Sequence, residues 1–248
     1  MLPLKLASLV LNAVAMLVTP GIPVGTALPV TLAATLDARK DKPGQKLEAR
    51  IMQDVPLPAG DRIKAGAHVT GHIVAVTRLP GGGSRMVLKF DQLTGSGRTV
   101  SLTTSARAIA AMESVYAAEI PIDAESNYEP QNQWVMRQVG GDIVNRGRGL
   151  VGSSDAIVGR WDKGAPWGKL TTALDGDCTA ADGNDIEQAL WVFSTSACGL
   201  YGFEDMKLVH SGRTDPVGQI VLESSKNLHL GGGSGWFLLV TATSAATN

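Results

Sequence analysis

Hydrophobic and polar residues alternate along the first half of the chain. Successive side chains of a β-strand point to opposite faces, so each alternating run predicts a strand with one face in a core and the other in water. We expect Leu47, Ile51, Val69 and Leu88 to point into that core. The alternating runs occupy residues 31–36, 47–52, 68–75 and 86–91.

Turn-forming residues separate these runs. Lys42-Pro43-Gly44 and Pro80-Gly81-Gly82-Gly83 are two examples. Glycine accepts the backbone angles of tight turns, and proline fixes its own φ angle. Short strands joined by such turns predict a small β-barrel or sandwich over residues 28–110. The predicted fold class of the chain is therefore mainly β.

The pattern becomes less regular after residue 110. Phe90 is the only aromatic residue before position 111, and all five tryptophans lie beyond it. This shift predicts an aliphatic core in the first part and a largely aromatic core in the second. The Ala-rich run 106–118 and the run 134–139 favour short helices, so we expect residues 111–155 to form a helix or linker region. The later strand candidates are residues 156–160, 169–173, 189–193, 206–210, 218–222, 227–230 and 236–241.

The first 27 residues have the layout of a secretory signal. Lys5 precedes an apolar run from Leu6 to Val18, and small residues reach Ala27, where we expect cleavage. The apolar run is shorter than the roughly 20 residues of a transmembrane helix. An uncleaved anchor and a buried core helix are the alternatives. No later stretch is long and apolar enough to span a bilayer, so we expect a soluble mature protein in the periplasm or outside the cell.

The cysteine content and the net charge agree with a location outside the cytoplasm. Cys178 and Cys198 are the only cysteines, and an isolated pair in an oxidising compartment predicts a disulfide. A disulfide that closes a loop of about 20 residues would stabilise the folded chain by roughly 3 kcal/mol. A reactive thiol or metal ligand is the alternative, but no CxxC motif supports it. The net charge is −1, which provides no basic surface for nucleic acid.

Several polar groups are candidates for chemistry, each with a simpler explanation. Acidic residues around positions 175–185 supply oxygens of the kind that Ca²⁺ binds, but their spacing differs from an EF-hand and fits a solvated loop. His68 and His72 lie on one face of a predicted strand, too far apart to share an ion. Serines at 194–196 and at Ser234 lack the Gly-x-Ser-x-Gly pattern of a hydrolase nucleophile. We expect no metal and no cofactor.

Two tryptophans are the best candidates for a binding contact. Trp161 and Trp167 flank Lys163-Gly164-Ala165-Pro166, a predicted exposed turn. Tryptophan is favoured at interfaces and stacks on sugars, so these side chains could contact a partner protein or a glycan. A hydrolase would need paired carboxylates such as Glu187 and Asp205, which nothing in the sequence brings together.

Motifs between residues 30 and 110 resemble a known family, the TrbI-like β-barrel module of conjugation and type IV secretion scaffolds. They are Leu36-Asp37, Lys42-Pro43-Gly44, Ala49 with Asp54-Val55, Ile63-Lys64-Ala65-Gly66-Ala67, Gly71-His72-Ile73, and Phe90-Asp91-Gln92-Leu93 with the hairpin to Val100-Ser101-Leu102. The resemblance implies a barrel of the cell envelope. Ala65-Gly66 departs from the usual Pro/Lys-Gly, and a shared fold does not imply membership of a secretion machine.

The resemblance leaves two domain arrangements open. Strand candidates in residues 207–243 resemble the closing strands of such a barrel, which would make residues 118–205 an insertion. In the other arrangement residues 156–248 form a consecutive, disulfide-containing β region.

The predicted function is that of a non-enzymatic bacterial envelope protein, a structural or protein-interaction module. Its expected partners are envelope proteins or cell-wall glycan. The alternatives are a glycan-binding module and a hydrolase with its site in the C-terminal half. A deep pocket that gathers two or more ionisable side chains would favour the enzyme.

Overall fold

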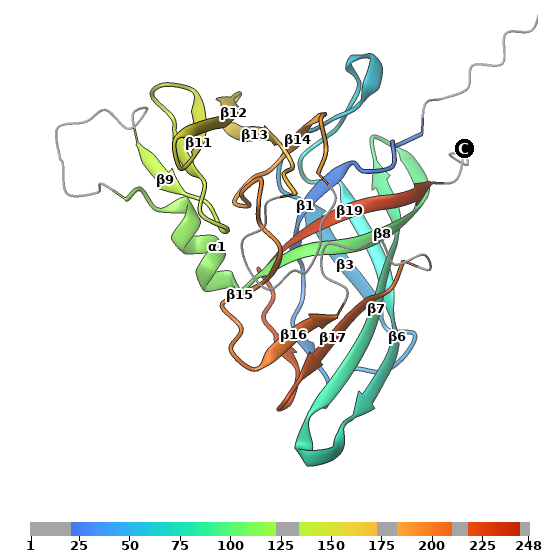
Figure 1. Ribbon diagram of the computed structural model, residues 1–248. Helices are drawn as coiled ribbons and strands as arrows, with labels where there is room; N and C mark the ends of the chain where they lie inside the picture. The colour runs from blue at the N-terminus through green and yellow to red at the C-terminus, as the bar shows by residue number, and fades with distance from the viewer. Residues whose placement is uncertain (1–20, 123–133, 173–182, 210–217, 244–248) are drawn as a thin grey trace, which may run out of the picture.

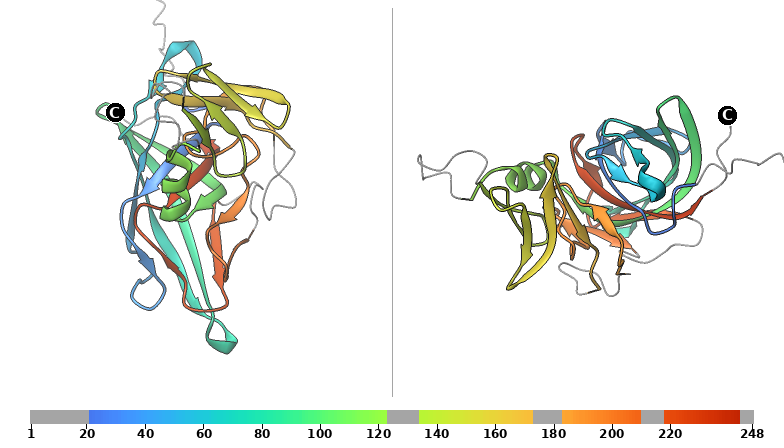
Figure 2. Two further views of the ribbon diagram at one scale, coloured as in Figure 1. Left: turned by 90° about the vertical axis from the view of Figure 1, so that its left-hand side faces the viewer. Right: turned by 90° about the horizontal axis from the view of Figure 1, so that it is seen from above.

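The computed structural model describes residues 21–122, 134–172, 183–209 and 218–243 of the 248-residue chain. These residues form a nine-stranded sheet, a six-stranded sheet, two small two-stranded sheets and the helix α1 (Met112–Glu119). The predicted mainly β fold is confirmed. Seen from above, the larger sheet curves into a ring, with the six-stranded sheet and α1 beside it (Figure 2).

Six strands of the larger sheet close into an antiparallel barrel (Figure 1). The last strand lies between β8 and β1, and the β7–β8 hairpin completes the ring. The barrel is therefore discontinuous in sequence, as in the arrangement with an insertion. Its strands are β1 (Ala27–Leu32), β3 (Lys46–Ile51), β6 (His68–Arg78), β7 (Ser84–Gly95), β8 (Arg98–Ala110) and β19 (Gly235–Thr243).

Shorter strands extend the barrel at its margins. β17 (Ile220–Ser224) pairs with the first part of β7, and β16 (Met206–Val209) pairs with β17. β15 (Gly199–Tyr201) runs parallel to the end of β8. The two-stranded sheets are β2 (Leu36–Asp37) with β18 (His229–Leu230), and β4 (Val55–Pro56) with β5 (Arg62–Ile63). Two short 3-10 helices span Pro58–Gly60 and Pro80–Gly82.

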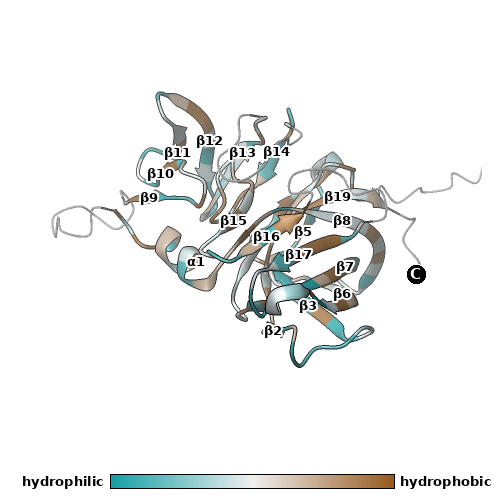
Figure 3. Ribbon diagram, turned by 60° about the horizontal axis from the view of Figure 1, so that its bottom comes forward, coloured by the Kyte–Doolittle hydropathy of each residue, from teal (hydrophilic) through white to brown (hydrophobic). Residues whose placement is uncertain are grey.

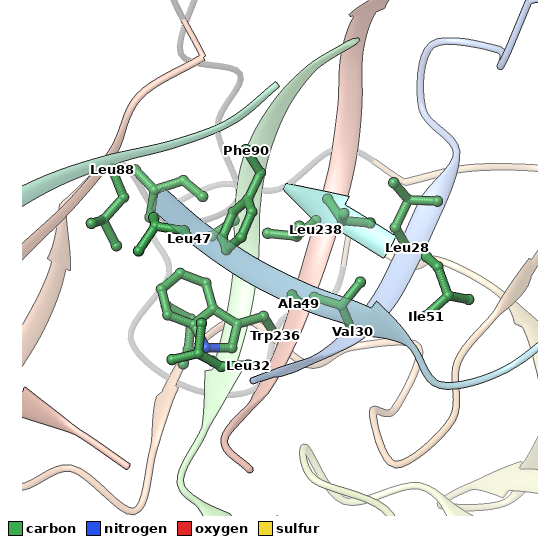
Figure 4. Close-up of a cluster of buried hydrophobic side chains, with 14 of the residues drawn as sticks. Leu28, Val30, Leu32, Leu47, Ala49, Ile51, Leu88, Phe90, Trp236 and Leu238 are labelled. Carbon is green, nitrogen blue, oxygen red and sulfur yellow. The ribbon is translucent and has the colours of Figure 1, made fainter. Parts of the chain in front are cut away.

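The barrel interior contains the predicted aliphatic side chains and one aromatic from the far end of the chain. Leu47, Ile51, Val69 and Leu88 are at most 4% exposed. Trp236 packs edge-to-face on Phe90, with ring centroids 5.6 Å apart, among the aliphatic side chains of β1 and β3 (Figure 4). The predicted aliphatic core of the first part therefore also holds an aromatic side chain from the second part, because β19 brings Trp236 into it.

A second core lies outside the barrel wall. The outward side chains of β8 and β19, including Ala108, Phe237 and Leu239, are covered by residues 190–197 and α1. Phe193 stacks on Phe237 with ring centroids 5.0 Å apart. Strands buried on both faces show continuous apolar runs in place of alternation. Hydrophobic stretches of the barrel strands are brown in Figure 3.

The six-stranded sheet corrects the predictions for residues 111–169. β8 continues to Ala110 and α1 begins only at Met112. The predicted helical run 134–139 contains a strand that pairs with its neighbour, and three strands lie in the expected linker. In place of the predicted strand 169–173, the structure has a strand over Ala165–Lys169, which pairs with residues 159–162 in a tight hairpin. The strands are β9 (Val135–Arg137), β10 (Ile143–Asn145), β11 (Leu150–Ser153), β12 (Ala156–Asp162), β13 (Ala165–Lys169) and β14 (Glu187–Ala189).

The predicted signal segment is described only from residue 21 onward. Ile22 is 5% exposed in the barrel core, and the Gly25 amide donates to the Val240 carbonyl. Cleavage directly after Ala27 would remove these contacts and place the new amino group at the fully buried Leu28. In the described part of the chain, no helix has the length and apolar character needed to cross a bilayer.

Candidate functional site

The six-stranded sheet presents two different faces, which the strand register defines. Directly paired residues of antiparallel strands lie on the same face. Arg160 pairs with Trp167 and with Leu150, which defines the Arg160 face. Trp161 pairs with Pro166 on the opposite side, the Trp161 face. The two predicted contact residues, Trp161 and Trp167, are therefore on opposite faces of one hairpin.

A groove of about 450 Å³ lies between the Arg160 face and the β4–β5 hairpin of the barrel. The groove joins segments that are about one hundred positions apart in the sequence. Its principal lining residues are Met52, Asp54, Pro56, Leu57 and Arg62 from the barrel side, and Arg160, Asp162, Lys163, Trp167, Glu187 and Trp191 from the other side.

Arg160 organises the sheet wall of the groove. Its Nε and Nη2 donate to the two carboxylate oxygens of Glu187 at 2.8 and 2.7 Å, and Nη1 donates to Asp162 at 2.7 Å. The hydrogen bonds to Glu187 are the main reason why the pKa of Arg160 is raised, and burial opposes them. The guanidinium lies 5.7 Å from the ring centroid of Trp167. A bidentate pair on an aromatic ring gives this wall a fixed geometry.

Asp54 organises the barrel wall. Its Oδ1 accepts a hydrogen bond from the Ala65 amide at 2.9 Å, and Oδ2 accepts from Lys64 at 3.1 Å and from Arg62 at 3.4 Å. Partial burial favours the neutral carboxyl, but the amide and the two cations outweigh it and lower the pKa of Asp54. The groove therefore has an ionised, internally paired charge cluster on each wall.

Two buried glutamines connect the walls. Gln53, 2% exposed, donates to the Pro166 carbonyl at 2.9 Å and accepts from the Trp191 amide at 2.7 Å. Gln188, 4% exposed, accepts from the Ala27 amide at the start of β1. Each joins the barrel to the second part by buried hydrogen bonds, which specify geometry because a missing partner is costly. The groove is thus a fixed feature of the fold.

The predicted contact residues contribute differently. Trp167 is 8% exposed and lines the groove, where its indole N–H donates to the Asp162 carbonyl at 3.2 Å. Trp161 is half-buried, and the guanidinium of Arg146 lies 4.4 Å from its ring centroid. Of the predicted exposed turn, Lys163 and Gly164 are exposed, whereas Ala165 and Pro166 are buried because they begin strand β13. A partner or glycan contact at either residue remains a prediction.

The other candidate groups lie apart from the groove or have partners that explain them. His68 lies 2.9 Å from Glu48, and His72 lies 3.3 Å from Asp91. Glu187 is bound to Arg160, whereas Asp205 pairs with Lys226 at 3.5 Å, so the two carboxylates serve different cations. The Ser234 hydroxyl accepts from the Trp236 indole.

Some predicted positions lie outside the described residues. These are Cys178 and most of the acidic loop, so the calcium alternative and the disulfide stay predictions. Cys198 is fully buried. Among the described residues, no group of three His, Cys, Asp or Glu side chains is placed to hold a metal ion.

Sequence reasoning missed the buried polar residues. Gln53 follows Leu47, Ala49 and Ile51 at the same two-residue spacing. That alternation could have predicted that its side chain is buried. Arg107 is a single charge within an apolar stretch of β8 and is fully buried. No such sequence pattern predicts that Gln188 is buried.

Comparisons of the chain with family models, curated proteins and solved structures give no match. The resemblance to TrbI-like barrels stays a prediction. The geometry of the groove is therefore the basis for a functional proposal.

Proposed function

We propose that this chain is a non-enzymatic, exported envelope protein that acts as a protein-interaction module. Its binding surface is the groove between the barrel and the Arg160 face, and the ligand is a segment of a partner protein. The observation that carries this proposal is the groove itself, whose walls hold both signs of charge around apolar and aromatic side chains.

The groove has the residue types that contribute most to protein interfaces. Arginine and tryptophan are enriched among the residues that dominate binding energy, and fixed side chains lose little entropy on association. Arg160 is held by three short hydrogen bonds and Trp167 is buried beneath it. The wall is therefore arranged for binding before a partner arrives.

Apolar residues continue this surface beyond the groove. Ile143 and Ile157 both pair with Gly152, so they lie on the Arg160 face, where they are 37% and 69% exposed. Exposed apolar side chains gathered on one face mark interaction sites more often than single ones do. A partner segment that leaves the groove would meet them next.

The charge pairing supports binding over catalysis. A general acid needs a carboxyl whose pKa is raised, and Asp54 has a lowered pKa. Glu187 and Asp162 are both engaged by Arg160. The export part of the proposal is supported by the N-terminal pattern and the single cysteine pair.

Crosslinking and capture from intact envelopes tests the proposal. Arg160→Gln removes the charge at the centre of the groove and leaves a neutral side chain. Arg39→Gln, at an exposed position next to the β2–β18 pair and outside the groove lining, is the matched control. We expect the wild type and the control to capture the same defined neighbour and Arg160→Gln to lose it. Equal capture by all three proteins would contradict the groove as the binding surface.

A further inference from the structure

A second cavity, of about 200 Å³, lies on the Trp161 face between the sheet and the end of α1. Its walls are mainly apolar and aromatic, and include Met136, Val144, Trp161, Pro166, Trp191 and Val192. Glu119, Gln138 and Arg146 supply polar groups. A mostly apolar pocket with few polar groups is the usual composition of a small-ligand site.

Two buried polar atoms of this lining have no hydrogen-bond partner among the described residues. They are Oε1 of Gln138 and the indole Nε1 of Trp191. Gln138 is 3% exposed, and its amide nitrogen donates to the Trp191 carbonyl, which fixes the side chain. Unsatisfied buried polar groups are rare in native proteins, and each calls for a cause such as a bound molecule. One atom is an acceptor and the other a donor.

The backbone of Trp191 is held in an unfavourable conformation. Its φ is +51°, in the left-handed region that bulky side chains seldom adopt. Its amide donates to Gln53 and its carbonyl accepts from Gln138, so buried hydrogen bonds on both sides maintain it. Strain of this kind concentrates at ligand-binding positions. Here it places one tryptophan in the lining of the cavity.

Arg146 adds a positive charge to the lining. Its guanidinium lies over Trp161, and no carboxylate lies within ion-pair distance of it among the described residues. Its donors remain available to hydroxyl oxygens at the cavity.

We propose that this cavity binds one pyranose ring of a glycan. Sugar hydroxyls both donate and accept hydrogen bonds, so they can satisfy an acceptor on Gln138 and a donor on Trp191, two residues of the lining. The C–H face of the ring packs on tryptophan, and a cavity of this size holds about one ring. The site lies on the face opposite to the proposed protein groove and shares only Gly164 and Trp191 with its lining. The variants that test it leave both shared residues unchanged, so failure of one proposal does not imply failure of the other.

The test is a titration of the full chain with free monosaccharides. Glucose, galactose, mannose and N-acetylglucosamine are added at millimolar concentration, the range in which a ligand bound by about −4 kcal/mol saturates. Saturation-transfer NMR reports contact with the sugar. We expect saturable binding of at least one sugar, about tenfold weaker binding for Trp161→Leu and Gln138→Met, and unchanged binding for Tyr116→Leu, an exposed aromatic position outside both linings.

Thermal unfolding verifies that each variant folds, and Arg146→Gln at the half-buried guanidinium replaces any variant that does not. Absence of a transfer signal for all four sugars would overturn the proposal, with only water left to satisfy the two buried atoms. Binding that survives all the cavity variants would also overturn it. Co-sedimentation with peptidoglycan sacculi, compared with vesicles that carry lipopolysaccharide, then identifies the source of the ring.

Discussion

Replacement of Arg107 by methionine should destabilise the whole chain, because this side chain of the barrel wall joins the second part to the barrel by several buried hydrogen bonds. Arg107 is fully buried on β8. Its Nε donates to the Ala197 carbonyl at 3.0 Å, and Nη2 donates to the carbonyls of Thr171 and Thr195 at 2.7 and 3.2 Å. Thr195 in turn donates to the buried carboxylate of Asp142 through its amide and its hydroxyl.

The magnitude follows from what methionine cannot replace. The Thr195 carbonyl keeps a second donor, the Thr171 amide at 3.1 Å, so the change falls mainly on the Ala197 and Thr171 carbonyls, which lose the donor that Arg107 supplies. Each buried acceptor that loses its partner costs about 1–3 kcal/mol, which gives about 2–6 kcal/mol in total. Removal of a buried charge also removes its desolvation cost, which favours the middle of that range, about 3–4 kcal/mol.

Urea unfolding measures this free energy. Arg98→Met is the control, because Arg98 is exposed on the same strand and its loss should change the free energy of unfolding by less than about 0.5 kcal/mol. In thermal unfolding Arg107→Met should lower Tm by about 10 °C, given about 2–4 °C per kcal/mol for a chain of this size. If both variants unfold within about 0.5 kcal/mol of the wild type, the buried guanidinium does not join the two parts.

Three further predictions concern the barrel, the groove and the cysteines. Gly71→Ala should destabilise the barrel by more than about 3 kcal/mol in urea unfolding, because an added Cβ would lie 1.7 Å from the Lys89 carbonyl oxygen. The control is Gly231→Ala, which has open space around the added Cβ and should leave the free energy of unfolding nearly unchanged. Asp54 has a lowered pKa in the folded state, so its contribution to stability is complete above the unfolded value near 3.8 and is lost as the pH falls through the folded value. The stability of the wild type should therefore fall more steeply than that of Asp54→Asn on acidification below pH 5, and parallel curves would exclude the effect. Alkylation without reduction should leave Cys178 and Cys198 unmodified, as read by mass spectrometry, and two alkylated cysteines would refute the disulfide. Cys198→Ser should lower the free energy of unfolding by about 3 kcal/mol.

The barrel strands were predictable where one face of the strand meets water. Alternation then reports the inward side chains directly, as at Leu47 and Val69. β19 and the second half of β8 bury both faces, so the order of apolar and polar residues there does not identify a single inward face. The entry of Trp236 into the barrel core depends on β19 pairing with β1, which is distant in the sequence, and the hydrophobic pattern within β19 does not by itself predict that contact.

The second part was less predictable because its strands are short and stabilise one another. β9 has three residues, too few for any period to emerge, and its pairing with β10 decides its structure. The sequence identified the two tryptophans of the β12–β13 hairpin as candidates. It did not predict that they lie on opposite faces of the sheet. The barrel side of the groove comes from a hairpin about one hundred positions earlier. The hydrogen bonds of Gln53 that position it appear only in three dimensions.

Site-specific photocrosslinking in living cells tests the proposed groove most directly. A photoreactive amino acid replaces Lys163, exposed at the groove, or Lys46, exposed on the outer face of barrel strand β3. We predict that the probe at 163 forms one discrete adduct with an envelope protein and that the probe at 46 does not. Adducts of the same size and yield from both positions, or from position 46 alone, would contradict a partner segment bound between the barrel and the six-stranded sheet.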